Sequence, residues 1–457
     1  MIAASKRTIK MVGFLQAQNC SIAPGSWRHP ANAMDFLTPE YFQRIGRVLE
    51  EGKFHLAFFD DRLAMPDIYG DDHGAAVEYG IRAVKMDPVS IITAIAMATS
   101  RIGLGITYST TYYEPFHVAR LFATLDLMSK GRAAWNVVTS LNNSEAANFG
   151  RDEHLAHDLR YERADEFMEV VTGLWKSWDA DAIQLDKESG KFADPSKVHA
   201  LNHKGKFFNV RGPLPVPPSE QGQPIVIQAG QSGRGRQFAG QWGELIFVVY
   251  PTIEAGKKQY AEVKKAVTDA GRNPDDVAIC PACYVCVGET DAIAEEKREY
   301  IRALAKPIDA VVLLSEALNF DFASKPMDSE FTDEELGKLS WTGFKERVIS
   351  LSGKANPTVR DFVHFSGRGT IGEFPIFCGT PTKVADQMEE WFTGGACDGF
   401  VLAATHTPGA FEDFTRFVVP ELQRRGLYHQ DYEGTTLREN LGLKMPEPRT
   451  FFKVAAE

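Results

Sequence analysis

Extended apolar runs and amphipathic helical patterns alternate eight times along this chain, and this alternation constrains the fold more than any other feature. A strand, a helix and a second strand form the unit of a parallel sheet whose faces are covered by helices. Eight consecutive strand–helix pairs are the number that closes such a sheet into a barrel. The sequence therefore predicts an α/β fold, a TIM (β/α)8 barrel with insertions.

The boundaries of these elements can be placed from the periodicity and from capping residues. The predicted strands cover residues 9–15, 55–59, 102–108, 133–138, 225–229, 244–249, 277–287 and 399–404. The helices that follow them are expected at 39–51, 88–100, 116–129, 164–177, from 233 onward, and at 253–270, 292–305 and 411–425. Asp87 and Pro88 have the residue types typical of an N-cap and a first helical position.

Residues 1–457 are expected to form a single domain with four irregular segments. Residues 139–163 form a long polar connection, which is usually functional in a compact domain. Residues 178–224 are expected to be a surface excursion. Residues 307–377, between the seventh helix and the eighth strand, are rich in phenylalanine and predict either a lid over the barrel mouth or a helical hairpin at a subunit contact. The C-terminal tail, 427–457, is expected to pack on a neighbouring subunit.

The charge balance restricts the class of partner. The chain carries 61 acidic and 50 basic side chains, a net charge of -11, which disfavours nucleic acid and anionic membranes. No apolar run is long enough to span a bilayer, and the N-terminus does not resemble a secretion signal, so a cytoplasmic protein is expected. Cys280, Cys283 and Cys286 have the spacing of iron–sulfur ligands, but they lie in a predicted strand and are interpreted as buried structural thiols.

In a barrel of this kind, functional groups lie at the carboxyl ends of the strands. At the end of the fifth strand, in the segment QAGQSGRGRQF, Gly230, Ser232 and Gly233 lie at the predicted start of a helix. Free N–H groups and the positive helix end attract a phosphate, and glycines allow close approach. The segment lacks the glycine order of a dinucleotide fold, so it predicts a single phosphate. The alternative is a glycine-rich turn without a ligand.

Two histidines in the long connection allow more than one interpretation. His154 and His157 have HxxH spacing, but no second histidine cluster supports a metal site, and none is predicted. His157 and Tyr161 are four residues apart at a helix start and can donate to one phosphate, or they can simply form an unliganded helix end. Asp61 is either a ligand acceptor or an N-cap, and His29 could be a structural histidine.

Several motifs together carry a resemblance to a known family. They include GSWRHP, EEGKFHLAFFDD, WNVVTS, HDLRYERADEF, FADPSKVH, VIQAGQSGRGR and VVPELQRRGLY. In this order, and over nearly the whole chain, they resemble the bacterial-luciferase-like flavin monooxygenases, in the branch with nitrilotriacetate, dibenzothiophene-sulfone and long-chain-alkane monooxygenases.

The resemblance implies a cofactor and a partner. Members of this family use reduced FMN, supplied by a separate NAD(P)H-dependent flavin reductase, with O2 as co-substrate, and are usually homodimers or homotetramers. Matched position by position, the flavin site would comprise Asp61, Thr107, His157, Tyr161 and Ser232, with Asn136 beside the ring. His157, Tyr161 and Ser232, which are assigned to phosphate binding on physical grounds, are among these residues.

The substrate side departs from the relatives, which often place histidines in the first loop and in the insertion. Here Cys20 and Glu316 stand in those segments and, with His29 and Asn136, are the candidate catalytic groups. The expected substrate is a small apolar molecule, first an organosulfur compound cleaved at a C–S bond. The alternatives are an alkane or halogenated aromatic substrate, a flavin- or deazaflavin-dependent reductase, and a non-catalytic flavin-binding barrel. Phe14, Phe58, Phe59 and Trp135 are predicted to shelter the reaction from water.

Overall fold

Eight parallel strands close on themselves in the computed structural model, which describes residues 7–19, 21–140, 142–339 and 342–446. The barrel order is β1, β2, β3, β4, β9, β10, β11 and β13, and β13 returns to β1. The strands are β1 (Lys10–Gln16), β2 (Leu56–Asp60), β3 (Gly103–Ser109), β4 (Ala133–Val138), β9 (Ile225–Gln228), β10 (Leu245–Val248), β11 (Ala278–Val287) and β13 (Gly399–Ala403). The predicted TIM barrel is confirmed.

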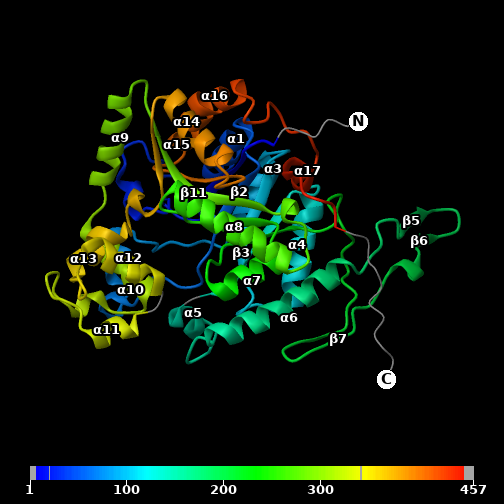
Figure 1. Cartoon of the computed structure of the whole chain (residues 1–457). Helices are drawn as coiled ribbons and strands as arrows, with labels where there is room; N and C mark the ends of the chain where they lie inside the picture. The colour runs from blue at the N-terminus through cyan, green and yellow to red at the C-terminus, as the bar shows by residue number, and fades with distance from the viewer. Residues whose placement is uncertain (1–6, 20, 141, 340–341, 447–457) are drawn as a thin grey trace.

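Helices cover the outside of the barrel, each following its strand (Figure 1). They are α1 (Pro39–Glu51), α3 (Pro88–Ala98), α4 (Pro115–Met128), α6 (His157–Trp175), α7 (Gly233–Trp242), α8 (Ile253–Asp269) and α9 (Asp291–Ala303). The eighth is interrupted: α15 (Gly409–Asp413) passes through a π-helical turn, Phe414–Val418, into α16 (Val419–Arg424). Pro420 lies in the first turn of α16, where its missing N–H removes no helical bond.

The connection at 139–163 is more ordered than predicted. It contains α5 (Asn143–Asn148), and α6 begins at His157 rather than at Ala164. The first turn of α6 is largely polar and exposed, so it has none of the apolar periodicity by which a helix is predicted.

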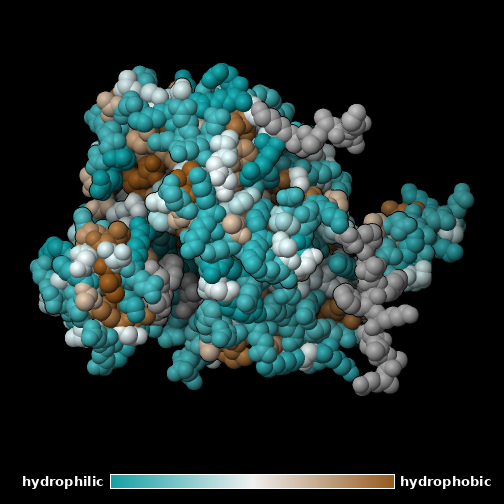
Figure 2. All heavy atoms as spheres, viewed as in Figure 1, coloured by the Kyte–Doolittle hydropathy of each residue, from teal (hydrophilic) through white to brown (hydrophobic). Residues whose placement is uncertain are grey.

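The insertion forms a lobe beside the barrel. It consists of α10 (Pro307–Leu318), α11 (Asp333–Lys338), α12 (Thr342–Ser352) and α13 (Val359–Ser366), around its own core of Phe322, Phe331 and Phe362. The lobe stands at the lower left of Figure 1, and Figure 2 shows hydrophobic residues gathered on its face. Helix α2 (Gly74–Tyr79) packs against α10.

A further strand and helix follow the lobe and were not predicted. β12 (Ile376–Gly379) pairs with the second half of β11, outside the closed barrel, and leads into α14 (Pro381–Thr393). The first half of β11 pairs with β10, so this strand of 10 residues pairs with one neighbour along its first half and with β12 along its second half. The 4 residues of β12, of which two are only partly buried, lie at the end of the predicted insertion and lack the fully buried apolar run that marks β9 and β10.

Residues 178–224 form two hairpins, β5 (Ile183–Asp186) with β6 (Lys191–Ala193) and β7 (His203–Lys204) with β8 (Asn209–Val210). The first projects from the body of the molecule (Figure 1). Its strand residues are mostly exposed, including Phe192 at 61%.

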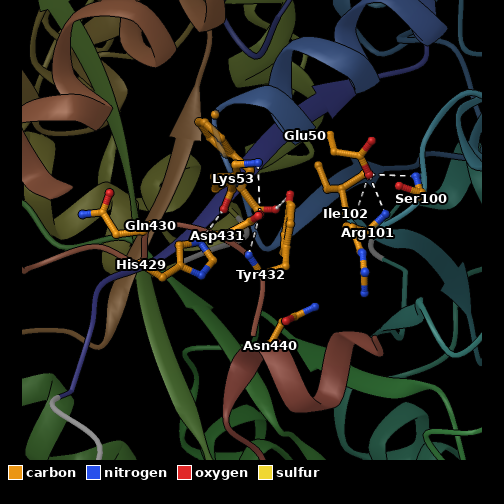
Figure 3. A network of polar contacts seen from close by, with 12 residues as sticks. Glu50, Lys53, Ser100, Arg101, Ile102, His429, Gln430, Asp431, Tyr432 and Asn440 are labelled. Atoms are coloured by element: carbon orange, nitrogen blue, oxygen red, sulfur yellow. Dashed lines mark hydrogen bonds and ion pairs between the residues drawn. The ribbon is translucent and has the colours of Figure 1, made fainter. Parts of the chain in front are cut away.

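Within the described residues, the C-terminal tail packs on its own barrel, and its packing on a neighbouring subunit stays a prediction. Tyr432 donates a hydrogen bond to the Phe54 carbonyl (2.7 Å), and His429 contacts the Lys53 carbonyl, in the network drawn in Figure 3. In α17 (Leu437–Leu441), Leu437 enters the barrel core, and Arg438 is 1% exposed and paired with Glu244. The tail therefore closes the amino-terminal end of the barrel and leaves the opposite end for a site.

Candidate functional site

A cavity of about 240 Å³ opens at the carboxyl end of the barrel. Four predicted cofactor residues line it: Asp61, Thr107, Tyr161 and Gly230. Asp61 follows β2, Thr107 lies near the end of β3, Tyr161 is on α6 and Gly230 follows β9. The converging fourth and fifth strand–helix connections thus meet at one hollow, as a single phosphate site requires. Arg62, Ser140, Glu145, Gln228 and Phe238 complete much of the lining and were not assigned from the sequence.

Asn136 lies buried beneath this cavity at the end of β4. Its Nδ2 donates to Thr107 Oγ1 (2.9 Å), whose hydroxyl in turn donates to the Phe59 carbonyl (3.0 Å). Its Oδ1 is buried and has no hydrogen-bond partner within the described part of the chain. A buried acceptor without a donor is costly, so its presence indicates a ligand N–H.

The opposite end of the cavity is a glycine cradle. A Cβ added to Gly230 would lie 2.8 Å from the Tyr161 hydroxyl oxygen, and one added to Gly235 would lie 3.0 Å from it. Ser232 caps α7 by accepting from the Gly235 N–H (3.0 Å). Burial raises the pKa of Tyr161, and the Ser232 side chain opposes that shift. A hydroxyl is thereby held beside the positive end of α7, the arrangement expected for a phosphate.

Three other predicted residues of this end lie at the rim. Ser232 and Gly233 are exposed at the start of α7. The His157 ring is 5.1 Å from that of Tyr161, with its Nδ1 2.8 Å from Asp158 Oδ1, and its side chain is 49% exposed. His154 is withdrawn from the cavity: its Nδ1 lies 2.6 Å from the Tyr112 hydroxyl, and burial lowers its pKa to about 4.

Asp61 is a carboxyl of the cavity wall with a strongly raised pKa. Burial raises its pKa to about 7, with Lys85 opposing the shift and Asp60 adding to it. One oxygen accepts from the Arg62 N–H (2.9 Å), so the carboxyl caps a turn and also faces the cavity. A carboxyl that titrates near neutrality can hold or release a proton during a reaction.

The predicted catalytic residues do not assemble with this group. His29 lines a separate cavity of about 350 Å³, stacked on His406 with ring centroids 3.9 Å apart. No residue of that cavity lines the first one. Cys20 lies outside the described residues.

Glu316, on α10, is held by protein donors. It accepts from the Asp67 and Ile68 N–H groups (3.3 Å each) and from Asn142 Nδ2 (2.6 Å), and it pairs with Arg62 at 3.6 Å. Burial raises its pKa. These contacts tie the lobe to two loops beside the cavity.

The predicted aromatic shelter is half correct, because alternate strand residues face opposite sides. Phe14 and Phe58 face the barrel interior, 5.3 Å apart, and Phe247 lies 4.8 Å from Phe58. Phe59 and Trp135 instead lie in the layer between strands and helices. The same alternation places Cys280 and Cys286 in the interior and Cys283 outside it, all buried and unpaired, with their pKa raised by burial.

The described residues were compared with two further kinds of site, a metal centre and a membrane segment. Among the described residues, no group of three or more His, Cys, Asp or Glu could hold a metal ion. Within the same part of the chain, no helix combines the length and apolarity needed to cross a bilayer.

The carboxyl end of the barrel therefore has a cavity with a glycine cradle at one end, and the comparisons with known proteins identify the class of enzyme. The luciferase-like monooxygenase family matches residues 18–397, so the chain belongs to that family and is a flavin-dependent oxidoreductase. The family uses reduced FMN and O2.

Individual relatives cover almost the whole chain. Dibenzothiophene-sulfone monooxygenase of Rhodococcus erythropolis is 44% identical over 445 residues, 97% of this chain and 98% of the relative. Nitrilotriacetate monooxygenase component A of Aminobacter aminovorans is 38% identical over 441 residues, 95% and 97% of the two chains. The crystal structure of a long-chain alkane monooxygenase superposes with a TM-score of 0.86 at 34% identity, covering 96% of each chain.

Proposed function

We propose that this chain is the oxygenase of a two-component system, which binds reduced FMN from a separate NAD(P)H:flavin reductase and uses O2 to oxygenate a small organosulfur compound. The single observation that carries the proposal is the cavity that joins the Tyr161–Gly230 cradle to Thr107, whose hydroxyl accepts from the buried Asn136. It offers a site for each end of one mononucleotide.

The residues present fit FMN. The phosphate would lie at the start of α7, near Tyr161 and Ser232, where glycines leave room for it. The free Oδ1 of Asn136 would accept a ring N–H, and Thr107 fixes that amide by its own hydrogen bond. When bound, the reduced flavin supplies the activation of O2, and the protein supplies binding, orientation and shelter.

The chain's own groups divide the remaining work. Phe14 and Phe58 exclude water below the cavity, which protects a reactive cofactor from wasteful reaction with solvent. Asp61 holds a proton at the wall near neutral pH and can pass it to or from the substrate. The lobe α10–α13, tied down through Glu316, acts as a lid beside the opening.

A separate reductase is supported by what the chain contains. Every strand of the described residues belongs to the barrel sheet or to the two hairpins, so this part of the chain offers no second domain for a nicotinamide nucleotide. The name of the Aminobacter relative, component A, implies that a further component exists there. The organosulfur substrate rests on the sulfone named for the Rhodococcus relative.

The test is turnover with labelled oxygen. The full chain is incubated with a flavin reductase, NADH, FMN, 18O2 and a panel of sulfones, sulfides, alkanes and chloroaromatics. We expect one label in an organosulfur product, formed only when reductase and FMN are both present. Label in a hydrocarbon product would overturn the substrate class. Turnover without oxygen would overturn the oxygenase itself.

A further inference from the structure

A second cavity, of about 310 Å³, lies beside the first and shares Asp61, Arg62 and Leu63 with it. The rest of its wall comes mainly from the loop after β2 and from the connection between α2 and α3. The remaining lining residues are Ala64, Met65, Arg82, Ala83, Lys85, Asp87, Tyr113 and Asn148. This wall combines apolar surface with charged groups, which differs from the apolar cavity that the sequence predicts.

Arg82 is the exceptional residue of this wall. It is 8% exposed, and its Nε is buried without a hydrogen-bond partner. Across the described residues, no hydrogen bond or ion pair engages its guanidinium. By contrast, the buried Arg132 donates to several carbonyls, and the buried Arg438 pairs with Glu244. Within the described chain, Arg160, Arg163 and Arg368 each also keep one buried nitrogen without a partner, but none of the three lines this cavity. Arg82 also has a φ of 53°, which non-glycine residues seldom adopt.

The carboxylates near Arg82 are already engaged. Asp60 accepts from Lys85 (2.7 Å) and from Gln16 (2.7 Å), and Asp87 caps α3 through the Val89 N–H (2.9 Å). The Asp61 carboxyl, with its pKa raised to about 7, is partly neutral at physiological pH. Of the three cations in the wall, Lys85 pairs with Asp60 and Arg62 pairs with Glu316, so Arg82 is the one without an ion pair among the described residues.

Arg82 stays charged near pH 7. Burial, followed by the positive charges of Arg368 and Arg62, lowers its pKa to about 10, while the nearby carboxylates of Asp60 and Glu373 oppose that shift. Neither carboxylate forms an ion pair with it, and a buried cation without a direct partner is unfavourable. The planar fork of a guanidinium matches the two oxygens of an oxyanion.

We propose that the second cavity receives an anionic group of the substrate, a carboxylate or sulfonate, on Arg82. This inference rests on the proposed function and narrows its substrate class to organosulfur compounds that carry such an anion. Leu63, Met65 and Tyr113 give the apolar part of the molecule a path toward the first cavity. The anion would orient the sulfur centre relative to the cofactor end, as a remote binding group does in other enzymes.

The test measures binding without flavin, on the full chain, by isothermal titration calorimetry. The probes are 4-(methylsulfonyl)benzoate and the neutral methyl phenyl sulfone, which differ only in the carboxylate. We expect the wild type to bind the anion at least about tenfold more tightly. Arg82→Gln should remove this preference without changing the affinity for the neutral sulfone. Arg302→Gln, on the exposed face of α9 and 57% exposed at its side chain, is the matched control and should keep it.

Three binding results would contradict the proposed role of Arg82. Equal or undetectable binding of the two probes to the wild type overturns it, as does a preference that survives Arg82→Gln. A loss of FMN affinity in Arg82→Gln, with probe binding unchanged, would assign Arg82 to the cofactor instead. If Arg82→Gln does not fold, the wild-type probe pair and Arg82→Lys, which should retain part of the preference, still decide. The calorimetry contains no flavin, so its result does not depend on turnover. A negative labelled-oxygen experiment would therefore overturn the proposed function, and a negative calorimetry result would overturn only the anion site.

Discussion

The two cavities that meet at Asp61 are built from different parts of the chain. The first is formed by the ends of β3, β4 and β9 with α6 and α7, elements of the barrel itself. The second is formed mainly by the loop after β2 and residues 80–87. Among the described residues, the buried Oδ1 of Asn136, next to Thr107 of the first cavity, has no donor, and the buried Nε of Arg82, in the wall of the second, has no acceptor.

The first cavity is built on strand ends and the second on loops, and these two kinds of structure differ in how much sequence change they tolerate. Strand ends are held by the ladder of a closed sheet, so a cofactor site built on them keeps its geometry. Loops tolerate replacement without loss of the core, so a substrate site built on them can change. The comparison therefore predicts that changes at the two cavities affect different ligands.

The largest effect is expected at the glycine cradle. In Gly230→Val, side-chain atoms would meet the Tyr161 hydroxyl, since even a Cβ would lie 2.8 Å from it. We expect FMN affinity to fall by about a hundredfold or more, roughly 2.7 kcal/mol, in a fluorescence titration. Anion binding in the second cavity should be retained. Gly337→Val, where an added Cβ meets nothing within 4 Å, is the control. If Gly230→Val weakened FMN binding and anion binding equally, the two cavities would not bind different ligands independently.

The next effect concerns Glu316, which joins the lobe to both cavity loops. Glu316→Ala leaves the Asn142 amide and two backbone N–H groups without their acceptor. We expect a loss of about 3 kcal/mol in unfolding free energy, measured by chemical denaturation. Glu316→Gln keeps an acceptor oxygen and should recover at least half of it. Full stability with no turnover in Glu316→Gln would instead support an acid–base role.

Asp61 belongs to both cavities and provides a test in pH. Its folded pKa, raised to about 7, lies above the value of an unfolded aspartate, so ionisation costs the folded state stability as pH rises between the two values. Asp61→Asn should therefore be more stable than the wild type by on the order of 2 kcal/mol above about pH 7, with the gain vanishing near about pH 4. Thermal unfolding across this range checks the prediction, and a gain independent of pH would contradict it.

The smallest effect is expected at the rim. His157 is 49% exposed at its side chain, and solvent screens any contact it makes with a phosphate. His157→Ala should weaken FMN binding by less than about threefold, within roughly 0.6 kcal/mol. Tyr161→Phe, inside the cavity, should cost more. The reverse order, by the same titration, would move the phosphate site outward to the rim.

Much of the barrel could be predicted because its signals are local. The strand at 133–138, the helix at 39–51 and the Asp87 cap on α3 were predicted correctly. Ser232, predicted at the start of a helix, caps α7. Periodicity and capping act over a few residues, so they can be recognised in the sequence.

The remaining features depend on contacts between distant residues. Arg82 has no local motif, and nothing in its neighbours in sequence indicates that its guanidinium lines a cavity. The position of the tail depends on Leu437 and Arg438 finding the open end of the barrel, more than 180 residues from Glu244 along the chain. Likewise His29, grouped from sequence with the catalytic candidates, stacks on His406 in a separate cavity.

The sequence by itself determined the barrel, the family and the residue types at the proposed phosphate site, because strand ends and helix starts are set by local chemistry. Only the tertiary structure decided which of those residues share a cavity, which face Phe59 and Trp135 occupy, and that the buried Arg82 Nε has no hydrogen-bond partner among the described residues. These properties arise when strands close into a sheet and loops meet, and a linear pattern does not contain the distances between them.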